Sequence, residues 1–294
     1  MNSIQPVFAY MGNKVDIAEW IIPLFPPHRI YVEVFGGTGA ILLNKLPSKS
    51  EFYNDYNQHL VNLFETTRIR KDEFFEQLKQ LPISEHLYKT FYDNHSDYTQ
   101  FPSVENAVRY LYIMSLCFMG KYDGGFKYDD GESFKYTFEK KMQLLEVIHK
   151  RMKGVVMLNK NYDKVVTQFG KREDVLMYLD PPYVNTEGYY KHLAGEFTVT
   201  DHIKLRDLLR KVKCKFFLSY EDDPMVNDLY GQFFYIWRKN KVRRGQLTQG
   251  GKGFAEEVIV TNYKEPSSLF TYEQLEETKK VTDDTSDTDS ACEE

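Results

Sequence analysis

The chain has 294 residues, 42% of them hydrophobic and 15% aromatic, which suits one elaborated domain or one domain that carries an insertion. The formal net charge of −5 arises in residues 265–294, which hold ten acidic side chains and two lysines, whereas residues 1–264 hold 36 basic and 33 acidic side chains, so a nucleic-acid partner is not excluded. Three widely spaced cysteines, no signal pattern and no apolar run of membrane-spanning length argue against a disulfide framework, a cysteine metal site and a membrane span, and favour a reduced, intracellular setting.

The first sixty residues have the pattern of a strand, a turn, a helix and a second strand, preceded by a short helix. Residues 14–22 have helical spacing and end before Pro23, because proline has no amide hydrogen to continue a helix. The apolar run 30–34 predicts a buried strand, residues 40–44 begin a helix, and residues 51–55 predict a strand that ends in an acid. This order is typical of the opening of a parallel, nucleotide-binding sheet.

The rest of the chain continues that sheet after an interruption. Residues from about 60 to 152 are rich in helix formers and aromatic residues, and they predict a mainly helical insertion. Further apolar runs predict strands at 155–158, 175–179, 216–219, 233–237 and 257–262, and a helix at 205–211. We therefore predict the α/β class, a doubly wound sheet interrupted by the insertion, with a charged Ser/Thr-rich tail at 265–294 that has no stable structure of its own.

A glycine cluster, Phe35-Gly36-Gly37-Thr38-Gly39, lies between the first predicted strand and its helix. Glycine at such a turn lets the backbone approach a ligand closely. The spacing lacks the third glycine of a dinucleotide fingerprint, because that position is Leu42, and it lacks the Gly-Lys-Ser/Thr ending of a P-loop. Two interpretations stay open: a simple tight turn, or an S-adenosylmethionine loop in which Asp55, at the end of the next strand, accepts from the ribose hydroxyls.

A second candidate loop, Asp180-Pro181-Pro182-Tyr183, follows the buried apolar run 175–179. The two prolines fix the backbone and remove two amide donors, which leaves carbonyl oxygens and the Asp180 carboxylate as acceptors. These acceptors match the two N–H groups of an exocyclic amine on a base, and the ring of Tyr183 offers a stacking surface for that base. The loop therefore indicates amine methylation, with an ordinary structural loop as the alternative.

Two stretches are candidates for phosphate contact. Five of the seven residues in 238–244 are basic, and glycines follow, which predicts a flexible basic loop along a nucleic acid or a solvated surface loop. In the second stretch, Lys121 and Lys127 alternate with the aromatic residues Tyr122, Phe126 and Tyr128, which fits either a nucleic-acid surface or a structural hairpin.

With these motifs placed, residues 6–264 resemble the Dam-like (alpha group) DNA adenine-N6 methyltransferases. The similar segments are Phe8-Ala9-Tyr10-Met11-Gly12-Asn13-Lys14, Val32 to Gly39, Asn54-Asp55-Tyr56-Asn57, Asp180 to Tyr183, Phe217 to Tyr220 and Glu257 to Tyr263. The chain departs from the family pattern at Met119, at Asp123 and at Asn161, where the family has asparagine, a basic residue and aspartate. The first two departures mean that the resemblance does not extend to the recognised DNA sequence.

The resemblance implies a Rossmann-like methyltransferase sheet formed by residues 1–62 and 153–264, an inserted target-recognition domain at 63–152 and an acidic tail at 265–294. It implies transfer of a methyl group from S-adenosyl-L-methionine to N6 of adenine in double-stranded DNA, at a specific site and after base flipping. It also implies no metal, a monomer or weak dimer, and a cytoplasmic location in a bacterial or phage-infected cell.

The resemblance also implies roles for individual residues. Expected in catalysis are Asp180, Pro181, Pro182 and Tyr183. Expected at the cofactor are Tyr10, Lys14, Glu33, Phe35, Gly37, Gly39, Asp55, Tyr56, Asn161, Tyr162 and Asp180. Expected at the DNA are Lys121, Tyr122, Lys127, Arg238, Lys241, Arg243 and Arg244. The alternatives are a methyltransferase that acts on another amine, such as cytosine N4, adenine in RNA or a protein glutamine, and a DNA-binding protein without catalysis.

Overall fold

The structure is a computed structural model. It describes residues 3–10, 12–94, 101–128, 137–183, 191–248, 251–264 and 276–277, and for residues 191–192, 240–248, 251–256 and 276–277 it describes the backbone alone.

The predicted sheet forms the centre of the molecule, and it is mixed, with parallel and antiparallel strands. Its strands are β1 (Ile30–Glu33), β2 (Ser50–Asn54), β3 (Val155–Leu158), β4 (Val175–Leu179), β5 (Lys215–Glu221), β6 (Tyr235–Thr248), β7 (Gly251–Thr261) and β8 (Glu276–Glu277). They lie side by side in the order β3-β2-β1-β4-β5-β7-β6-β8. The first five strands are parallel, and β7 runs antiparallel to both β5 and β6. This arrangement confirms the predicted doubly wound α/β class.

The order of the strands reverses between β1 and β4, which are hydrogen-bonded neighbours although β2, the insertion and β3 separate them in sequence. Both strands are buried along their whole length because their residues are almost entirely apolar. In open α/β sheets, ligands bind beyond the carboxyl ends of the strands at such a reversal. The glycine loop follows β1 and the Asp180 loop follows β4, so both lie at this point.

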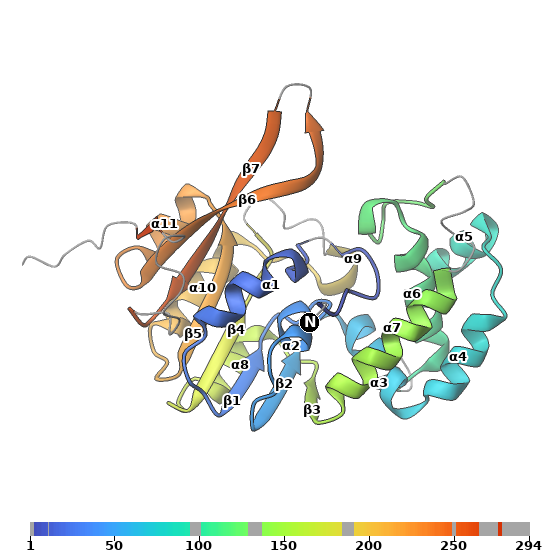
Figure 1. Cartoon of the computed structure of the whole chain (residues 1–294), viewed down its shortest axis with the longest axis horizontal. Coiled ribbons are helices and arrows are strands. Elements are labelled where there is room, and N and C mark those ends of the chain that lie inside the picture. Colours follow the sequence, from blue (N-terminus) through green and yellow to red (C-terminus); the bar gives the residue numbers. More distant parts are fainter. Residues whose placement is uncertain are drawn as a thin grey trace, which may run out of the picture.

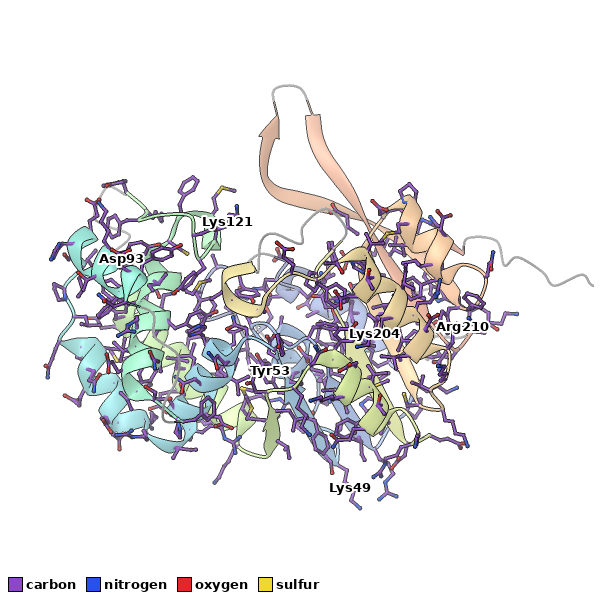
Figure 2. All side chains as sticks on the ribbon, turned by 180° about the vertical axis from the view of Figure 1, so that it is seen from behind. Lys49, Tyr53, Asp93, Lys121, Lys204 and Arg210 are labelled. Atoms are coloured by element: carbon purple, nitrogen blue, oxygen red, sulfur yellow. The ribbon has the colours of Figure 1, made fainter. Side chains whose placement is uncertain are left out.

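Helices cover both faces of the sheet (Figure 1). One face packs against α1 (Val15–Ile21) and α2 (Ala40–Asn44), and its core includes Tyr31, Tyr178 and Phe217. The opposite face, nearer the viewer in Figure 2, packs against α8 (Tyr162–Phe169), α10 (Val199–Leu209) and α11 (Pro224–Tyr230). Because side chains alternate along a strand, neighbouring residues of β1, β4 and β5 enter opposite cores.

The helical insertion forms a separate lobe beside the sheet (Figure 1). It contains α3 (Gln58–Ile69), α4 (Lys71–Lys79), α5 (Glu85–Asp93), α6 (Val104–Leu116), the 3-10 turn η2 (Phe118–Gly120) and α7 (Thr137–Met152). Side-chain caps begin three of these helices, at Asn57, Ser84 and Ser103. The boundary predicted after residue 62 falls inside α3, whose Asn57 cap places the start of the helical region five residues earlier.

Two details of the sequence interpretation were wrong. The basic stretch 238–244 is not a loop: it lies within β6 and pairs with β7, and the two strands form a long hairpin that projects from the sheet (Figure 1). Charge alone does not reveal that a partner strand satisfies the backbone of such a stretch. The helix predicted at 205–211 is α10, which begins earlier because Thr198 and Asp201 form a capping box.

The acidic tail 265–294 lies outside the described residues except for β8, whose backbone pairs with Trp237 and Arg238 of β6.

Candidate active site

The glycine loop after β1 needs glycine at several positions for different reasons. Gly37 and Gly39 have φ values of 51° and 73°, a left-handed conformation that favours glycine. Gly36 has no room for a side chain, since a Cβ there would lie 2.2 Å from Cε2 of the Tyr53 ring. Tyr10 borders the loop, with its ring 3.5 Å from the position that a Cβ of Gly37 would take. The structure therefore brings together the predicted residues Tyr10, Gly37 and Gly39.

Asp55, at the end of β2, ties the glycine loop to the neighbouring strand. One carboxylate oxygen accepts a hydrogen bond from the Gly37 amide at 2.7 Å, and the other accepts from the Asn57 amide at 2.7 Å. Burial of the carboxyl group raises the pKa of Asp55 to about 6, although these amide bonds act in the opposite direction. A carboxylate has about four acceptor sites, so Asp55 can still accept from a ligand hydroxyl.

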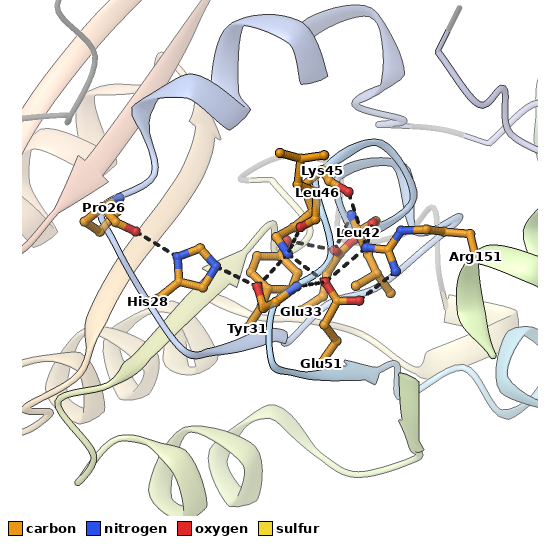
Figure 3. Close-up of polar contacts among 10 residues, drawn as sticks. Pro26, His28, Tyr31, Glu33, Leu42, Lys45, Leu46, Glu51 and Arg151 are labelled. Atoms are coloured by element: carbon orange, nitrogen blue, oxygen red, sulfur yellow. Dashed lines mark hydrogen bonds and ion pairs between the residues drawn. The ribbon is translucent and has the colours of Figure 1, made fainter. Parts of the chain in front are cut away.

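The hydrogen bonds of the Glu33 side chain are to other residues of the protein. Its side chain is 2% exposed, and Oε2 accepts from the Tyr31 hydroxyl at 2.9 Å and from the Leu42 amide at 2.8 Å (Figure 3). Burial raises the pKa of Glu33 to about 8, and both hydrogen bonds oppose this shift. Glu33 thus fixes the first turn of α2 and supports the glycine loop from behind.

Two predicted aromatic residues stack beside the glycine loop. The rings of Phe35 and Tyr162 are stacked with 5.7 Å between centroids, and Phe197 packs edge-on against Phe35 at 5.7 Å. Phe197 was not among the predicted residues. Asn161 caps α8 by accepting from the Asp163 amide at 3.4 Å, and Tyr56 exposes 57% of its surface after β2.

The predicted residues Lys14, Asp180 and Tyr183 meet in one charged cluster. The Lys14 ammonium lies 3.0 Å from Oδ1 of Asp180, and it also donates to the Tyr183 hydroxyl. The same ammonium lies 4.5 Å from the centre of the Tyr183 ring. Lys14 was expected at the cofactor, and this role stays a prediction; in the structure the ammonium contacts the catalytic loop.

Two residues that the sequence interpretation missed complete this cluster. Oε1 of Glu257, on β7, lies 3.4 Å from the Lys14 ammonium and accepts from the Tyr183 hydroxyl at 3.1 Å. The Ser219 hydroxyl, on β5, donates to the same oxygen. Burial alone would lower the pKa of Lys14, but the carboxylates of Asp180 and Glu257 outweigh it and raise that pKa above its usual value. The ammonium therefore stays charged at neutral pH.

The predicted DNA contacts in the insertion lie on a short hairpin, in which Cys117 pairs with Phe126. Lys121 and Lys127 are half-buried on this hairpin. The prediction for Tyr122 needs correction: the side chain is 5% exposed and packs between the rings of Tyr92 and Tyr110, so it stabilises the hairpin from inside. Its neighbours Phe118 and Met119, which were not predicted to contact DNA, are 54% and 61% exposed.

Arg238 is also corrected. Its guanidinium donates to Asp222 at 3.1 Å and to Asn227 at 2.6 Å, so it fastens α11 to the base of the hairpin rather than facing outward. The backbones of Lys241, Arg243 and Arg244 lie in the projecting part of β6, and their side chains lie outside the described residues.

A doubly wound sheet of this order, with a glycine loop and an acid-proline loop at its switch point, is the fold of a Rossmann-like methyltransferase. The family model of D12 class N6 adenine-specific DNA methyltransferases matches residues 10–244. The chain belongs to this family, and it is an adenine-specific DNA methyltransferase that uses a methyl donor.

Curated relatives are similar over most of this chain. The DNA adenine methylase of Vibrio cholerae is 25% identical over 72% of this chain and 78% of its own length. Modification methylase StsI of Streptococcus sanguinis is 23% identical over 89% of this chain and 43% of its own length. The DNA N-6-adenine-methyltransferase of Escherichia phage P1 is 22% identical over 87% of this chain and 35% of its own length.

Among the residues that the structure describes, no helix is long and apolar enough to cross a membrane, and no three His, Cys, Asp or Glu side chains gather as metal ligands do.

Proposed function

We propose that this enzyme transfers the methyl group of S-adenosyl-L-methionine to N6 of adenine within a specific sequence of double-stranded DNA. The observation that carries the proposal is the meeting of two loops at the β1–β4 switch point. The glycine loop is suited to a cofactor, and the Asp180 loop presents acceptors for an exocyclic amine.

The residues around the glycine loop fit the proposed cofactor. The Tyr10 ring borders the Gly37 backbone, and Asp55 offers acceptor sites for ribose hydroxyls. The Phe35 ring, which is backed by the buried ring of Tyr162, offers aromatic surface for a purine. When bound, S-adenosylmethionine supplies an electrophilic methyl group. The remaining predicted cofactor residues, Glu33, Gly39, Tyr56, Asn161 and Asp180, support or border this region.

The catalytic loop orients the amine. We propose that the Asp180 carboxylate and the Pro181 carbonyl accept the two N–H groups, so that the nitrogen lone pair faces the methyl group. Pro182 keeps the backbone rigid, and the ring of Tyr183 stacks on the flipped adenine. The bonds from Lys14 and to Glu257 hold the Tyr183 hydroxyl, and they fix the plane of the ring before a base arrives.

DNA binding is assigned to the helical lobe and to the β6–β7 hairpin. In this proposal Lys121 and Lys127 act in the target-recognition domain, and Lys241, Arg243 and Arg244 contact phosphates from the hairpin. Phosphate contact by two separate elements allows a monomer or weak dimer to hold one duplex.

Nucleoside mass spectrometry of unmethylated duplex DNA tests the proposal after incubation with the enzyme and S-adenosylmethionine. We expect N6-methyladenine from the wild-type enzyme and none above background from Asp180→Ala, while calorimetry still detects cofactor binding to that variant. Asp174→Ala is the matched control, because Asp174 precedes the same strand and pairs with Arg172 on the surface. Near-normal turnover in Asp180→Ala, or methylation of cytosine instead, would refute the assignment.

A further inference from the structure

We infer that Glu257 is a positioning residue, which orients the catalytic loop through Lys14 and Tyr183 without touching the substrate. The inference rests on the proposed function. It concerns a residue on the last long strand of the sheet, far in sequence from the loop that it serves.

The geometry of one oxygen atom carries the inference. Oε1 of Glu257 receives three hydrogen-bond donors, each from a different part of the chain: the Ser219 hydroxyl on β5, the Tyr183 hydroxyl of the catalytic loop and the Lys14 ammonium before α1. Lys14 in turn contacts Asp180 at 3.0 Å and the Gly12 carbonyl at 3.3 Å. Both ends of the tetrapeptide, Asp180 and Tyr183, are thereby linked to one fixed carboxylate.

A contribution to the stability of the fold does not explain why the Glu257 carboxylate is buried. Glu257 is 3% exposed and Lys14 is 3% exposed, so both charges have lost most of their hydration. Buried ion pairs commonly stabilise a fold no more than apolar residues of similar volume. Charged groups kept in such a place are candidates for a functional role when they touch catalytic residues, and this cluster does.

Charge balance suggests what the residue does. Two carboxylates, Asp180 and Glu257, share the single ammonium of Lys14, so the cluster keeps one negative charge. With Glu257 neutral, Lys14 would pair with Asp180 alone, and the acceptor of the amine would be both neutralised and drawn toward the lysine. Methylation places positive charge on the amine nitrogen until a proton leaves, and a negative cluster stabilises that charge.

The chain supplies a matched control in Glu51. This buried carboxylate pairs with Lys45 at 2.6 Å and with Arg151 at 2.6 Å, in a cluster that shares none of the residues at the catalytic loop (Figure 3). Glu51→Gln therefore removes a buried, paired charge of the same kind. We expect it to reduce stability while it leaves the turnover of the folded enzyme unchanged.

The experiment compares Glu257→Gln, Glu51→Gln and the wild-type enzyme by single-turnover methylation and by separate affinity measurements for S-adenosylmethionine and duplex DNA. The amide keeps an acceptor for Ser219 and Tyr183 but removes the charge. We expect the rate with Glu257→Gln to fall roughly tenfold to a hundredfold, with both affinities within about threefold of wild type. A wild-type rate in Glu257→Gln overturns the inference, as does an equal loss of rate in both variants or a loss confined to affinity.

A double substitution covers the case in which Glu257→Gln does not fold. Lys14→Met combined with Glu257→Gln removes the two most buried charges together and leaves the Asp180 carboxylate, whose side chain is 17% exposed, as the remaining charge of the three. We therefore expect a folded protein that is as slow as Lys14→Met alone. An additional loss of tenfold or more in the double variant shows that Glu257 does not act through Lys14 and overturns the inference. Absence of methylation by the wild-type enzyme is a different result, because it refutes the proposed function itself.

Discussion

We predict that the carboxyl group of Asp55 makes binding of the proposed cofactor depend on pH in a range where an ordinary aspartate is fully ionised. Burial raises the pKa of Asp55 from 3.8 to about 6 in the free protein. The ionised form is the one that accepts ribose hydroxyls, so protonation below pH 6 removes an acceptor from the proposed site. Since about one tenth of the groups are ionised at pH 5, the affinity for S-adenosylmethionine should be about tenfold weaker there than at pH 7.

Calorimetric titrations between pH 5 and pH 7 measure this dependence. The upper limit matters because the α-amino group of the ligand titrates at about pH 7.7. Asp55→Asn is the control. The amide cannot accept from both the Gly37 and Asn57 backbone donors, so binding should be weaker, and it should lose the pH dependence that the wild-type protein shows. A wild-type affinity that is constant from pH 5 to pH 7, or an equal pH dependence in Asp55→Asn, would refute the reasoning.

Three further predictions concern the glycine loop and the hairpin of the insertion. Gly36→Ala should weaken cofactor binding by about tenfold or more, because the added Cβ would overlap the buried ring of Tyr53. Gly154→Ala is the control and should bind the cofactor normally, because no atom lies within 4 Å of its added carbon. Equal affinities of the two variants in calorimetry would contradict this prediction. Tyr122→Ala should lower the free energy of unfolding by about 3 kcal/mol in urea titrations. Lys121→Ala should instead leave the free energy of unfolding unchanged and reduce the number of ions released on DNA binding, measured from its salt dependence, by about one. If Lys121→Ala destabilised the fold and Tyr122→Ala changed only DNA binding, the roles assigned to the two residues would be interchanged.

The fold and the loops were predictable because their signals are local. Apolar runs such as 30–34 and 175–179 are long enough to identify buried strands, and glycine and proline mark the turns that follow them. Once the strands are parallel, their carboxyl ends share one edge of the sheet, which is why the Gly37 and Asp180 loops could be expected together. The resemblance to the Dam-like family added what these patterns do not carry, namely adenine and DNA.

The missed residues carry no local signal. Glu257 stands at the beginning of an apolar run, where a charged residue is the ordinary solvent end of a strand. Its burial becomes visible only when β7 lies beside β5 and α1 brings Lys14 over the same face. Tyr122 was misassigned for the opposite reason: it stands between Lys121 and Asp123, and charged neighbours in sequence say little about which way a ring points in a short hairpin.

Two residues of the N-terminal segment, Ala9 and Lys14, contact the two parts of the molecule to which DNA binding and chemistry are assigned. Gly120, in the hairpin of the insertion, lies so close to Ala9 that a Cβ would be 2.6 Å from the Ala9 carbonyl oxygen. A few residues further on, Lys14 contacts Asp180 of the catalytic loop. One short segment thus touches the lobe assigned to DNA and the loop assigned to chemistry.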